Sequence, residues 1–255
     1  MYHYHHLTIV IPVHNEAELL PSVVASLPDF VDHVVFVDDA STDDTQVVLR
    51  HLAESQPGRF TVLRHLQNQG VGAATITGYR HALANKADLI VLMDGDGQMD
   101  SRDLPVMLDT LIGGPFDFVK GNRFAHPSIN HMPWTRYLGN YILSWLTRLA
   151  LGYKQPVDAQ CGFTVFRATG LRQLDLNQLF PRYGFPNDLL FEVAAKGLYF
   201  TSVPVRTIYG NEISGINPFV VLPTILGLIA RGYWRRLGRQ SSKPRAQWSE
   251  TRASQ

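Results

Sequence analysis

Two aspartates and a glutamine follow an apolar run near the middle of this 255-residue chain. Leu89 to Met93 is apolar throughout, which is typical of a buried strand in a parallel sheet. Asp94, Asp96 and Gln98 come directly after it, separated by glycines that allow a tight turn. Two carboxylates and an amide oxygen suit a hard divalent cation that keeps coordination positions open for phosphate oxygens. For such a motif on its own, a solvated Asp-Gly turn is the simpler alternative.

The segments before this cluster alternate between predicted strands and predicted helices. Strands are expected over 7–13, 34–38, 60–63 and 89–93, with helices ending near 27, 53 and 85 and a further helix over 103–112. This alternation is typical of a doubly wound parallel α/β sheet. Ligands of such sheets bind outside the carboxyl ends of the strands. The polar residues that follow all these strands are therefore expected to form one site.

From about residue 116 the pattern changes. Strands are expected over 116–123, 158–167 and 200–205, a helix rich in large apolar residues over 134–151, and a helix from 185 to about 196. The tail over 239–255 is rich in Ser, Arg and Gln and is predicted to be disordered.

Composition excludes several classes of protein. The formal net charge of +1 gives no case for a nucleic-acid partner. A single cysteine, Cys161, excludes an internal disulfide framework and a multi-cysteine zinc site, and we expect a packed thiol. The histidine-rich start, residues 1–6, lacks the basic region of a secretory signal and is expected to be a solvated terminus.

The end of the second predicted strand carries another acidic group. Asp39 is placed where a carboxylate accepts hydrogen bonds from a nucleotide, while Ser41 or Thr42 is expected to cap the next helix. The loop with Gly70 and Gly72 follows the third strand and lacks the full dinucleotide-binding spacing, and no P-loop occurs. Oxidoreductase and kinase functions are therefore disfavoured.

Together these motifs resemble the GT-A glycosyltransferases of family 2, and within them the polyprenyl-phosphate glycosyltransferases typified by dolichol-phosphate mannose synthase. The matching stretches are 11–16, 37–45, 68–74, 93–98 (Met-Asp-Gly-Asp-Gly-Gln), 121–123, 158–163 and 203–205. The resemblance implies an α/β GT-A domain over 1–215, a mostly parallel sheet flanked by helices. It also implies an acceptor lid around 124–152.

The resemblance also implies roles for individual residues. The nucleotide-sugar would be held by Pro12, His14, Glu16, Asp39, Asp94, Gly95 and Arg206. Asp94 and Asp96 would be the metal-associated carboxylates, with Gln98 as a further ligand. Arg123 would face a phosphate of the acceptor or the donor. The candidate catalytic residues are Asp94, Asp96, Arg123 and Asp188.

The chemistry of the implied reaction agrees with these roles. A nucleotide-sugar leaves as a diphosphate, whose growing charge Mg²⁺ or Mn²⁺ on the aspartates would neutralise as a Lewis acid. Arg123 and Arg206 would add charge-assisted hydrogen bonds. For Arg206 a surface ion pair is an equally good interpretation. No residue is recognisable as a covalent nucleophile, so a single displacement with inversion is expected.

The acceptor decides whether a base is needed. A saccharide hydroxyl must lose a proton, and Asp188 is the candidate base, whereas a lipid phosphate is already anionic. Processive synthases of this family carry a Glu-Asp pair and a Gln-x-x-Arg-Trp motif; this chain has Asn187-Asp188 and no such motif. A polyprenyl phosphate is therefore favoured. Where the family often has a lysine in the loop over 209–214, this chain has Ile213, so the donor phosphate contact of this loop is expected either to be weaker or to come from Arg206.

Two segments predict contact with a membrane surface. No apolar stretch reaches the roughly 18 residues that a spanning helix needs. The helix over 134–151 mixes aromatic residues with two arginines, and the segment 216–238 combines a short apolar run containing proline with arginines. A peripheral protein at the cytoplasmic face is expected, although a core helix with a solvated tail is the alternative. A non-catalytic nucleotide-sugar-binding scaffold tethered to the membrane is the alternative of another class.

Overall fold

The computed structural model describes residues 1–153, 156–208 and 218–238, and its strands form one central sheet. The strands are β1 (Leu7–Val13), β2 (His33–Asp38), β3 (Phe60–Arg64), β4 (Leu89–Leu92), β5 (Phe118–Asn122), β6 (Thr164–Arg167) and β7 (Phe200–Pro204). Their order is β3-β2-β1-β4-β6-β5-β7. All described pairings are parallel except those of β6, which runs antiparallel to β4 and β5. The predicted mostly parallel α/β sheet is confirmed.

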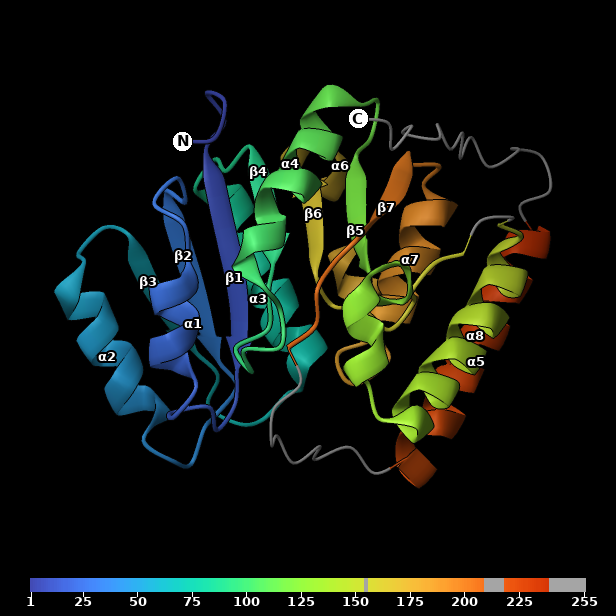
Figure 1. The fold of residues 1–255 in the computed structure, drawn as a ribbon, viewed down its shortest axis with the longest axis horizontal. Coiled ribbons are helices and arrows are strands. Elements are labelled where there is room, and N and C mark those ends of the chain that lie inside the picture. The colour runs from blue at the N-terminus through green and yellow to red at the C-terminus, as the bar shows by residue number, and fades with distance from the viewer. Residues whose placement is uncertain (154–155, 209–217, 239–255) are drawn as a thin grey trace.

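Helices cover both faces of this sheet (Figure 1). They are α1 (Leu20–Ser26), α2 (Thr45–Ser55), α3 (Val71–Ala84), α4 (Leu104–Gly113), α5 (Trp134–Leu151), α6 (Ala168–Leu171), α7 (Phe185–Ala195) and α8 (Pro218–Gly238), with short 3-10 turns over 101–103, 123–125, 127–131 and 176–178. Helices α1, α2 and α4 share one apolar cluster with one face of the sheet. Helices α3, α5, α6, α7 and α8 contribute to the cluster on the other face.

Strand β1 shows why the sheet lies between two layers of helices. All seven of its residues are buried, and successive side chains enter opposite clusters: Ile9 and Ile11 on one side, Val10 on the other. Continuous burial of this kind requires helices on both faces. The parallel strands all end at the lower edge of the sheet in Figure 1, where their polar carboxyl-terminal loops gather.

Several element boundaries differ from the sequence prediction. Helix α1 begins at Leu20 instead of directly after Glu16, and α2 begins at Thr45. The prediction that Ser41 or Thr42 caps α2 is wrong, because the Ser41 hydroxyl accepts a hydrogen bond from the Asn15 backbone N–H instead. The strand expected over 158–167 is confined to β6. Its first half forms a turn that enters the sheet at the same edge as the carboxyl ends of β4 and β5.

The C-terminal helix α8 lies alongside α5 and also packs on α7. Pro223 falls inside this helix and does not end it. No helix in the described part of the chain is long and apolar enough to cross a membrane. The predicted segments over 209–214 and 239–255 lie outside the described residues.

Candidate active site

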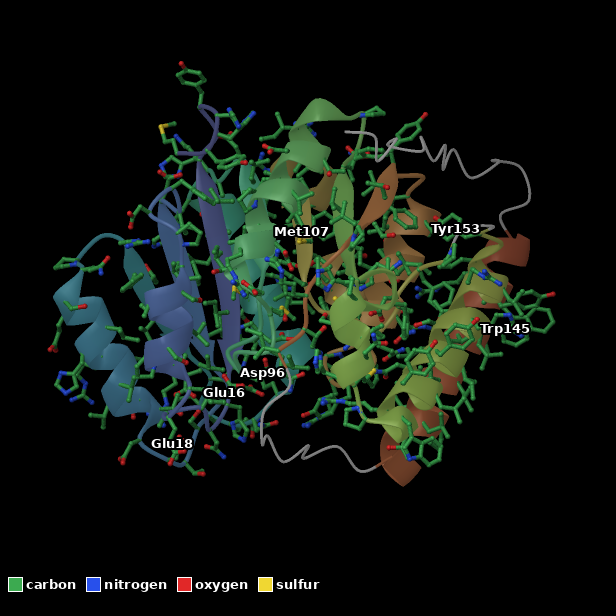
Figure 2. The ribbon with its side chains drawn as sticks, in the orientation of Figure 1. Glu16, Glu18, Asp96, Met107, Trp145 and Tyr153 are labelled. Atoms are coloured by element: carbon green, nitrogen blue, oxygen red, sulfur yellow. The ribbon has the colours of Figure 1, made fainter. Side chains whose placement is uncertain are left out.

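Three carboxylates meet where β1 and β4 end. Asp94 and Asp96 follow β4, and Glu16 follows β1, the strand beside it. Figure 2 shows Glu16 and Asp96 next to each other at the lower edge of the sheet. The glycine between the two aspartates allows a close approach, because a Cβ at Gly95 would lie 2.8 Å from the buried Val13 Cγ1 and 2.1 Å from Glu16 Oε2. Likewise, a Cβ on Gly162 would lie 2.8 Å from Asp94 Oδ2.

The carboxylates disturb one another's protonation. Burial and the neighbouring Asp96 raise the pKa of Asp94 to about 7. Burial, followed by the charges of Asp96 and Asp94, raises the pKa of Glu16 to about 9. Within the described residues, Glu16 Oε2 is buried without a hydrogen-bond partner. The cluster thus crowds carboxyl groups so closely that their ionised forms are disfavoured, and a bound cation relieves such crowding.

This cluster is not a complete metal cage by itself. Among residues 1–153, 156–208 and 218–238, no group of three or more His, Cys, Asp or Glu side chains is arranged to hold a metal ion. The two aspartates of the loop, with the Gln98 amide that the sequence predicts as a further ligand, would form an open donor set, as suits a cation that also binds substrate phosphates. The crowded carboxylates therefore fit a divalent cation shared with a ligand.

The loop that carries the aspartates is held in place at both ends. Asp96 Oδ1 accepts a hydrogen bond from the Gln98 backbone N–H at 2.9 Å, and Met99 Sδ accepts one from the Asp94 N–H at 3.3 Å. Ile208 N–H donates to the Gln98 carbonyl at 3.0 Å, and Met99 forms a β-bridge with Thr207. The segment after β7 thus fixes the loop from the second half of the chain.

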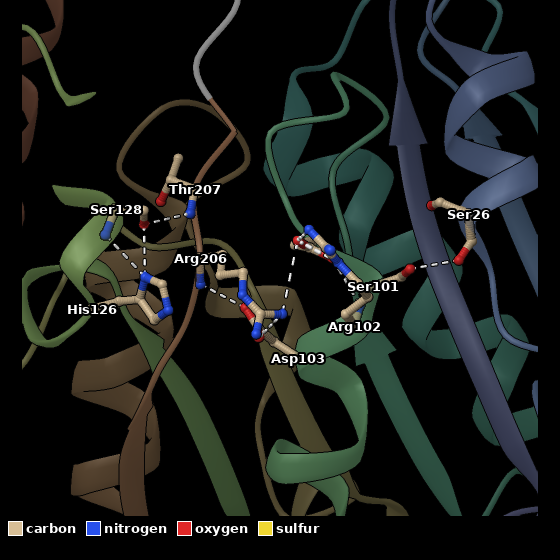
Figure 3. Close-up of polar contacts among 9 residues, drawn as sticks. Ser26, Ser101, Arg102, Asp103, His126, Ser128, Arg206 and Thr207 are labelled. Carbon is tan, nitrogen blue, oxygen red and sulfur yellow. Dashed lines mark hydrogen bonds and ion pairs between the residues drawn. The ribbon is translucent and has the colours of Figure 1, made fainter. Parts of the chain in front are cut away.

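Arg206 lies in an ion-pair network (Figure 3). Its guanidinium is 3.1 Å from Asp103 and 4.0 Å from Asp100, and its backbone N–H also donates to Asp103. The neighbouring Thr207 N–H donates to the hydroxyl of Ser128, which lies in the predicted lid. The surface ion pair that the sequence allowed for Arg206 is present, and its predicted phosphate contact stays a prediction.

Asp39 is almost completely buried and organises the loop before α3. Its Oδ1 accepts hydrogen bonds from His65 Nδ1 at 2.7 Å and from the Gln69 N–H at 2.9 Å. Its Oδ2 accepts one from the Gly70 N–H at 2.7 Å. Asp39 therefore fixes the backbone before α3 beside the carboxyl ends of β1, β2 and β3. The sequence predicts that the nucleoside binds there.

Two other residues that are predicted to contact the nucleoside lie at the end of β1. Pro12 is paired with Val37 inside the sheet, whereas His14 is exposed just beyond β1. Asn15 adopts a positive φ of 57°, and its side-chain oxygen accepts a hydrogen bond from the Thr42 N–H. This turn joins the ends of β1 and β2, so a ligand at this edge would contact both strands.

Arg123 lies at the end of β5 and is held by a residue that the sequence reasoning did not single out. Its Nε and NH2 atoms donate to the two oxygens of Asp158 at 2.6 and 2.9 Å. Burial alone would raise the pKa of Asp158, but Arg123 and the nearby Lys120 hold it below its usual range. Only 14% of the Arg123 side chain is exposed. Arg123 also lowers the pKa of Asp94, which places it beside the carboxylate cluster.

Asp188, the candidate base, is buried and bound by protein donors. One carboxylate oxygen accepts a hydrogen bond from the Phe180 backbone N–H at 2.9 Å, and the other is bound by Arg231 of α8. The structure thus places Asp188 against the C-terminal helix.

Tyr183 is a second residue that sequence reasoning missed. Burial, and then the charges of Asp94, Glu16 and Asp96, raise the pKa of its hydroxyl, so it lies near the carboxylate cluster although its side chain is half exposed. Its loop is packed closely against α3, since the Ala73 N–H donates to the Pro181 carbonyl at 2.9 Å. The tyrosine lies between Arg182 and Gly184 in a loop with no recognisable motif, so no sequence signal could have found it.

Comparison with known proteins identifies the family. The family model for glycosyl transferase family 2 matches residues 8–175. An undecaprenyl-phosphate mannosyltransferase from Micrococcus luteus is 33% identical over 241 residues, covering 90% of this chain and 98% of the relative. A UDP-N-acetylglucosamine–dolichyl-phosphate N-acetylglucosaminyltransferase from Methanococcus voltae is 31% identical over 214 residues, covering 79% of this chain and 85% of the relative.

The fold agrees with that of a solved enzyme. Glucosyl-3-phosphoglycerate synthase from Mycobacterium tuberculosis in complex with UDP superposes with a TM-score of 0.65 at 20% identity, covering 91% of this chain and 81% of that one. The same enzyme has also been solved with Mn²⁺, UDP and glucosyl-3-phosphoglycerate. The sheet, the acidic loop after β4 and the sequence relatives agree: the chain belongs to glycosyltransferase family 2 and is a glycosyltransferase.

Proposed function

We propose that this glycosyltransferase moves a hexose from a nucleotide-sugar, GDP-mannose or a UDP-sugar, to a polyprenyl phosphate at a membrane surface, with inversion at the anomeric carbon. The observation that carries the proposal is the pairing of a crowded carboxylate cluster with a nearby, firmly held arginine. The cluster suits the diphosphate of the donor through a cation, and the arginine suits a second phosphate. The relatives named for undecaprenyl and dolichyl phosphate support this acceptor class.

The donor would lie along the ends of β1, β2 and β4. Asp39 and the 14–16 turn would hold the nucleoside, and Asp94 and Asp96, with Gln98, would hold Mg²⁺ or Mn²⁺. When bound there, the cation supplies Lewis-acid stabilisation of the leaving diphosphate. Glu16 lies beside the two aspartates with one buried oxygen that lacks a hydrogen-bond partner, and a bound cation would lower its raised pKa and stabilise its ionised form. Solved Mn²⁺ complexes with this fold are consistent with such a metal.

The acceptor would approach from the β5 side. Arg123 presents a guanidinium fixed by Asp158, which would orient an incoming phosphate by charge-assisted hydrogen bonds. A phosphate oxygen is anionic and attacks without giving up a proton, so no general base is needed. That both oxygens of Asp188 are bound to Phe180 and Arg231 supports a phosphate acceptor over a saccharide hydroxyl.

Helices α5 and α8 would make the membrane contact. Their shared surface exposes 74% of Trp134, 45% of Trp145 and 69% of Trp234. Figure 2 shows Trp145 projecting from α5 away from the sheet. Exposed tryptophans on adjacent helices are typical of an interfacial surface, where the ring lies at the level of the head groups. We propose that this face rests on the cytoplasmic side of a membrane and so meets the lipid acceptor.

The test is a transfer assay with three donors, GDP-mannose, UDP-glucose and UDP-N-acetylglucosamine, and two acceptors, undecaprenyl phosphate in detergent micelles and a soluble oligosaccharide. The proposal predicts a glycosylated lipid phosphate by mass spectrometry with one donor, dependent on Mg²⁺ or Mn²⁺ and lost in Asp96→Asn. Sugar on the oligosaccharide, abolished in Asp188→Asn, would instead establish the hydroxyl acceptor. Donor binding without any transfer or hydrolysis would establish the scaffold.

A further inference from the structure

A line of buried polar side chains crosses the apolar cluster between α5 and Arg123. Thr147 on α5, Asn187 on α7 and Asp158 in the turn before β6 are each 0% exposed. They come from three separate parts of the chain. Their meeting inside one cluster is therefore a property of the tertiary structure.

The contacts along this line are short and continuous. Asn187 Nδ2 donates to Thr147 Oγ1 at 2.8 Å, and Gln160 Nε2 donates to Asn187 Oδ1 at 2.8 Å. The Gln160 backbone N–H donates to Asp158 Oδ1 at 3.2 Å. The same Asp158 oxygen accepts the Arg123 NH2 at 2.9 Å. Asn187 is thus linked to Arg123 through the Gln160 side chain and the turn that carries Asp158.

Burying the Asn187 amide in apolar surroundings costs free energy unless its polar atoms are hydrogen-bonded. Its neighbours on the first turns of α7 are Phe185, Leu189 and Leu190, all buried members of the apolar cluster. A leucine would satisfy this packing, whereas a buried amide must find partners for its polar atoms. Both ends of Asn187 have partners. In some proteins buried polar links of this kind fix a particular geometry more than they add stability.

We propose that Asn187 is a positioning residue for Arg123. Through its hydrogen bond to Gln160 it fixes the 158–161 turn, and the turn fixes the carboxylate that aligns the guanidinium. The buried Lys120 ammonium, which donates to the Cys161 carbonyl, holds the other end of the same turn. Asn187 is 0% exposed and is therefore not available for contact with donor or acceptor. That the guanidinium then binds the acceptor phosphate rests on the proposed function, whereas the positioning of Arg123 does not.

The neighbouring residue shows that this role is specific to Asn187. The carboxylate of Asp188, one position along α7, instead accepts hydrogen bonds from Arg231 and from the Phe180 backbone N–H. Thr147 is bonded to the same Asn187 amide but on the side facing α5, and its hydroxyl donates to the Leu143 carbonyl. Thr147→Val is therefore a matched control, because it removes an equally buried bond of Asn187 without touching Gln160.

The first readout is independent of the substrate. In ¹⁵N spectra of the full chain, the Arg123 Nε–H signal, assigned by its loss in Arg123→Lys, reports how firmly Asp158 holds the guanidinium. We expect hydrogen exchange of this group to be at least fivefold faster in Asn187→Leu and unchanged within twofold in Thr147→Val, because local openings govern exchange. Equal exchange in wild type and Asn187→Leu, or equal acceleration in both variants, overturns the inference.

The second readout uses the proposed reaction. With undecaprenyl phosphate, Asn187→Leu should raise the KM for the acceptor about fivefold, the effect expected of one lost hydrogen bond, with kcat within twofold and donor affinity unchanged. Gln160→Met removes the same bond from a partly exposed position and should reproduce both results, which covers the case that Asn187→Leu does not fold. An inactive wild type refutes the proposed function alone, because the exchange readout still decides the inference.

Discussion

Replacing Asp158 with asparagine tests whether the ion pair fixes Arg123. Asp158 is completely buried and accepts three hydrogen bonds from Arg123: from Nε at 2.6 Å, from NH2 at 2.9 Å and from the backbone N–H at 3.2 Å. Asparagine has nearly the same shape but keeps only one accepting oxygen. Its amide N–H atoms would face the N–H donors of the guanidinium, and the arginine charge would lose its partner.

The expected loss follows from the burial of both groups. Removing one partner of a buried ion pair costs about 3–5 kcal/mol. We expect the lower end, about 3 kcal/mol, because asparagine keeps one acceptor and 14% of the Arg123 side chain is exposed. For a protein of this size each kcal/mol lowers Tm by roughly 2–4 °C, so Tm should fall by roughly 6–12 °C. Urea denaturation at pH 7 measures the loss.

The loss should also depend on pH. Arg123 and Lys120 hold the pKa of Asp158 below its usual range although burial opposes them. A carboxyl whose pKa is lowered by folding stabilises the protein above its unfolded-state pKa, about 3.9, and this contribution disappears as pH falls through the lower folded-state value. The difference between wild type and Asp158→Asn should therefore be complete at pH 7 and shrink below about pH 4.

Two results would refute this reasoning. One is an Asp158→Asn protein whose unfolding free energy lies within about 0.5 kcal/mol of wild type, the range of ordinary surface substitutions. The other is a difference that does not change between pH 7 and pH 3. Asp109→Asn is the matched control, because Asp109 is an exposed carboxylate bonded to Tyr2, and it should change stability by less than about 0.5 kcal/mol.

Three further substitutions test other parts of the structure. Gly95→Ala should destabilise the protein by about 1–3 kcal/mol and abolish donor binding in calorimetry, because the added Cβ would meet the buried Val13 Cγ1 at 2.8 Å and push the Glu16 carboxylate out of the cluster. Arg231→Met should cost about 3 kcal/mol in urea denaturation, because it leaves the buried Asp188 carboxylate without its cation. Trp145→Glu should weaken sedimentation with anionic vesicles several-fold at unchanged Tm, because an interfacial aromatic side chain is lost.

Each of these substitutions has a control and a contradicting result. Gly113→Ala, at a glycine with open space around its Cβ position, should leave donor binding unchanged, and a Gly95→Ala protein that still binds donor refutes the close approach. Arg50→Met changes an exposed arginine, and an equal effect of both arginine substitutions refutes the α7–α8 anchor. Val47→Glu, on α2, changes an exposed apolar residue far from α5 in the sequence, and equal loss of vesicle binding in both variants refutes the proposed membrane face.

The sequence predicted the sheet because its signals there are local. Strands such as 7–13 and 89–92 are short apolar runs, each followed by polar residues and a helix, and parallel topology alone brings their ends together. The meeting of Asp94 and Asp96 with Glu16 follows from β1 and β4 being neighbours. The helix over 134–151 was predicted at its observed boundaries, because a glycine and a proline frame a long amphipathic segment.

The rest depends on contacts between distant segments. Asp158 lies 35 residues from Arg123, and nothing local marks the pair. Asp188 is a plausible base as an acidic residue in a first helical turn, and only the position of α8 reveals its bond to Arg231. Arg206 likewise needed the positions of Asp100 and Asp103. These ion pairs are set by packing, which residue order along one element does not encode.

Donor binding measured by calorimetry, with and without divalent cation, tests most directly that the Glu16, Asp94 and Asp96 cluster is a metal-dependent nucleotide-sugar site. GDP-mannose, UDP-glucose and UDP-N-acetylglucosamine would be titrated into wild type and Asp96→Asn, in Mn²⁺ and in EDTA. The predicted result is heat of binding for donors of one nucleotide in Mn²⁺ only, lost in Asp96→Asn. Binding of equal strength in EDTA, or in Asp96→Asn, would contradict the assignment of the cluster.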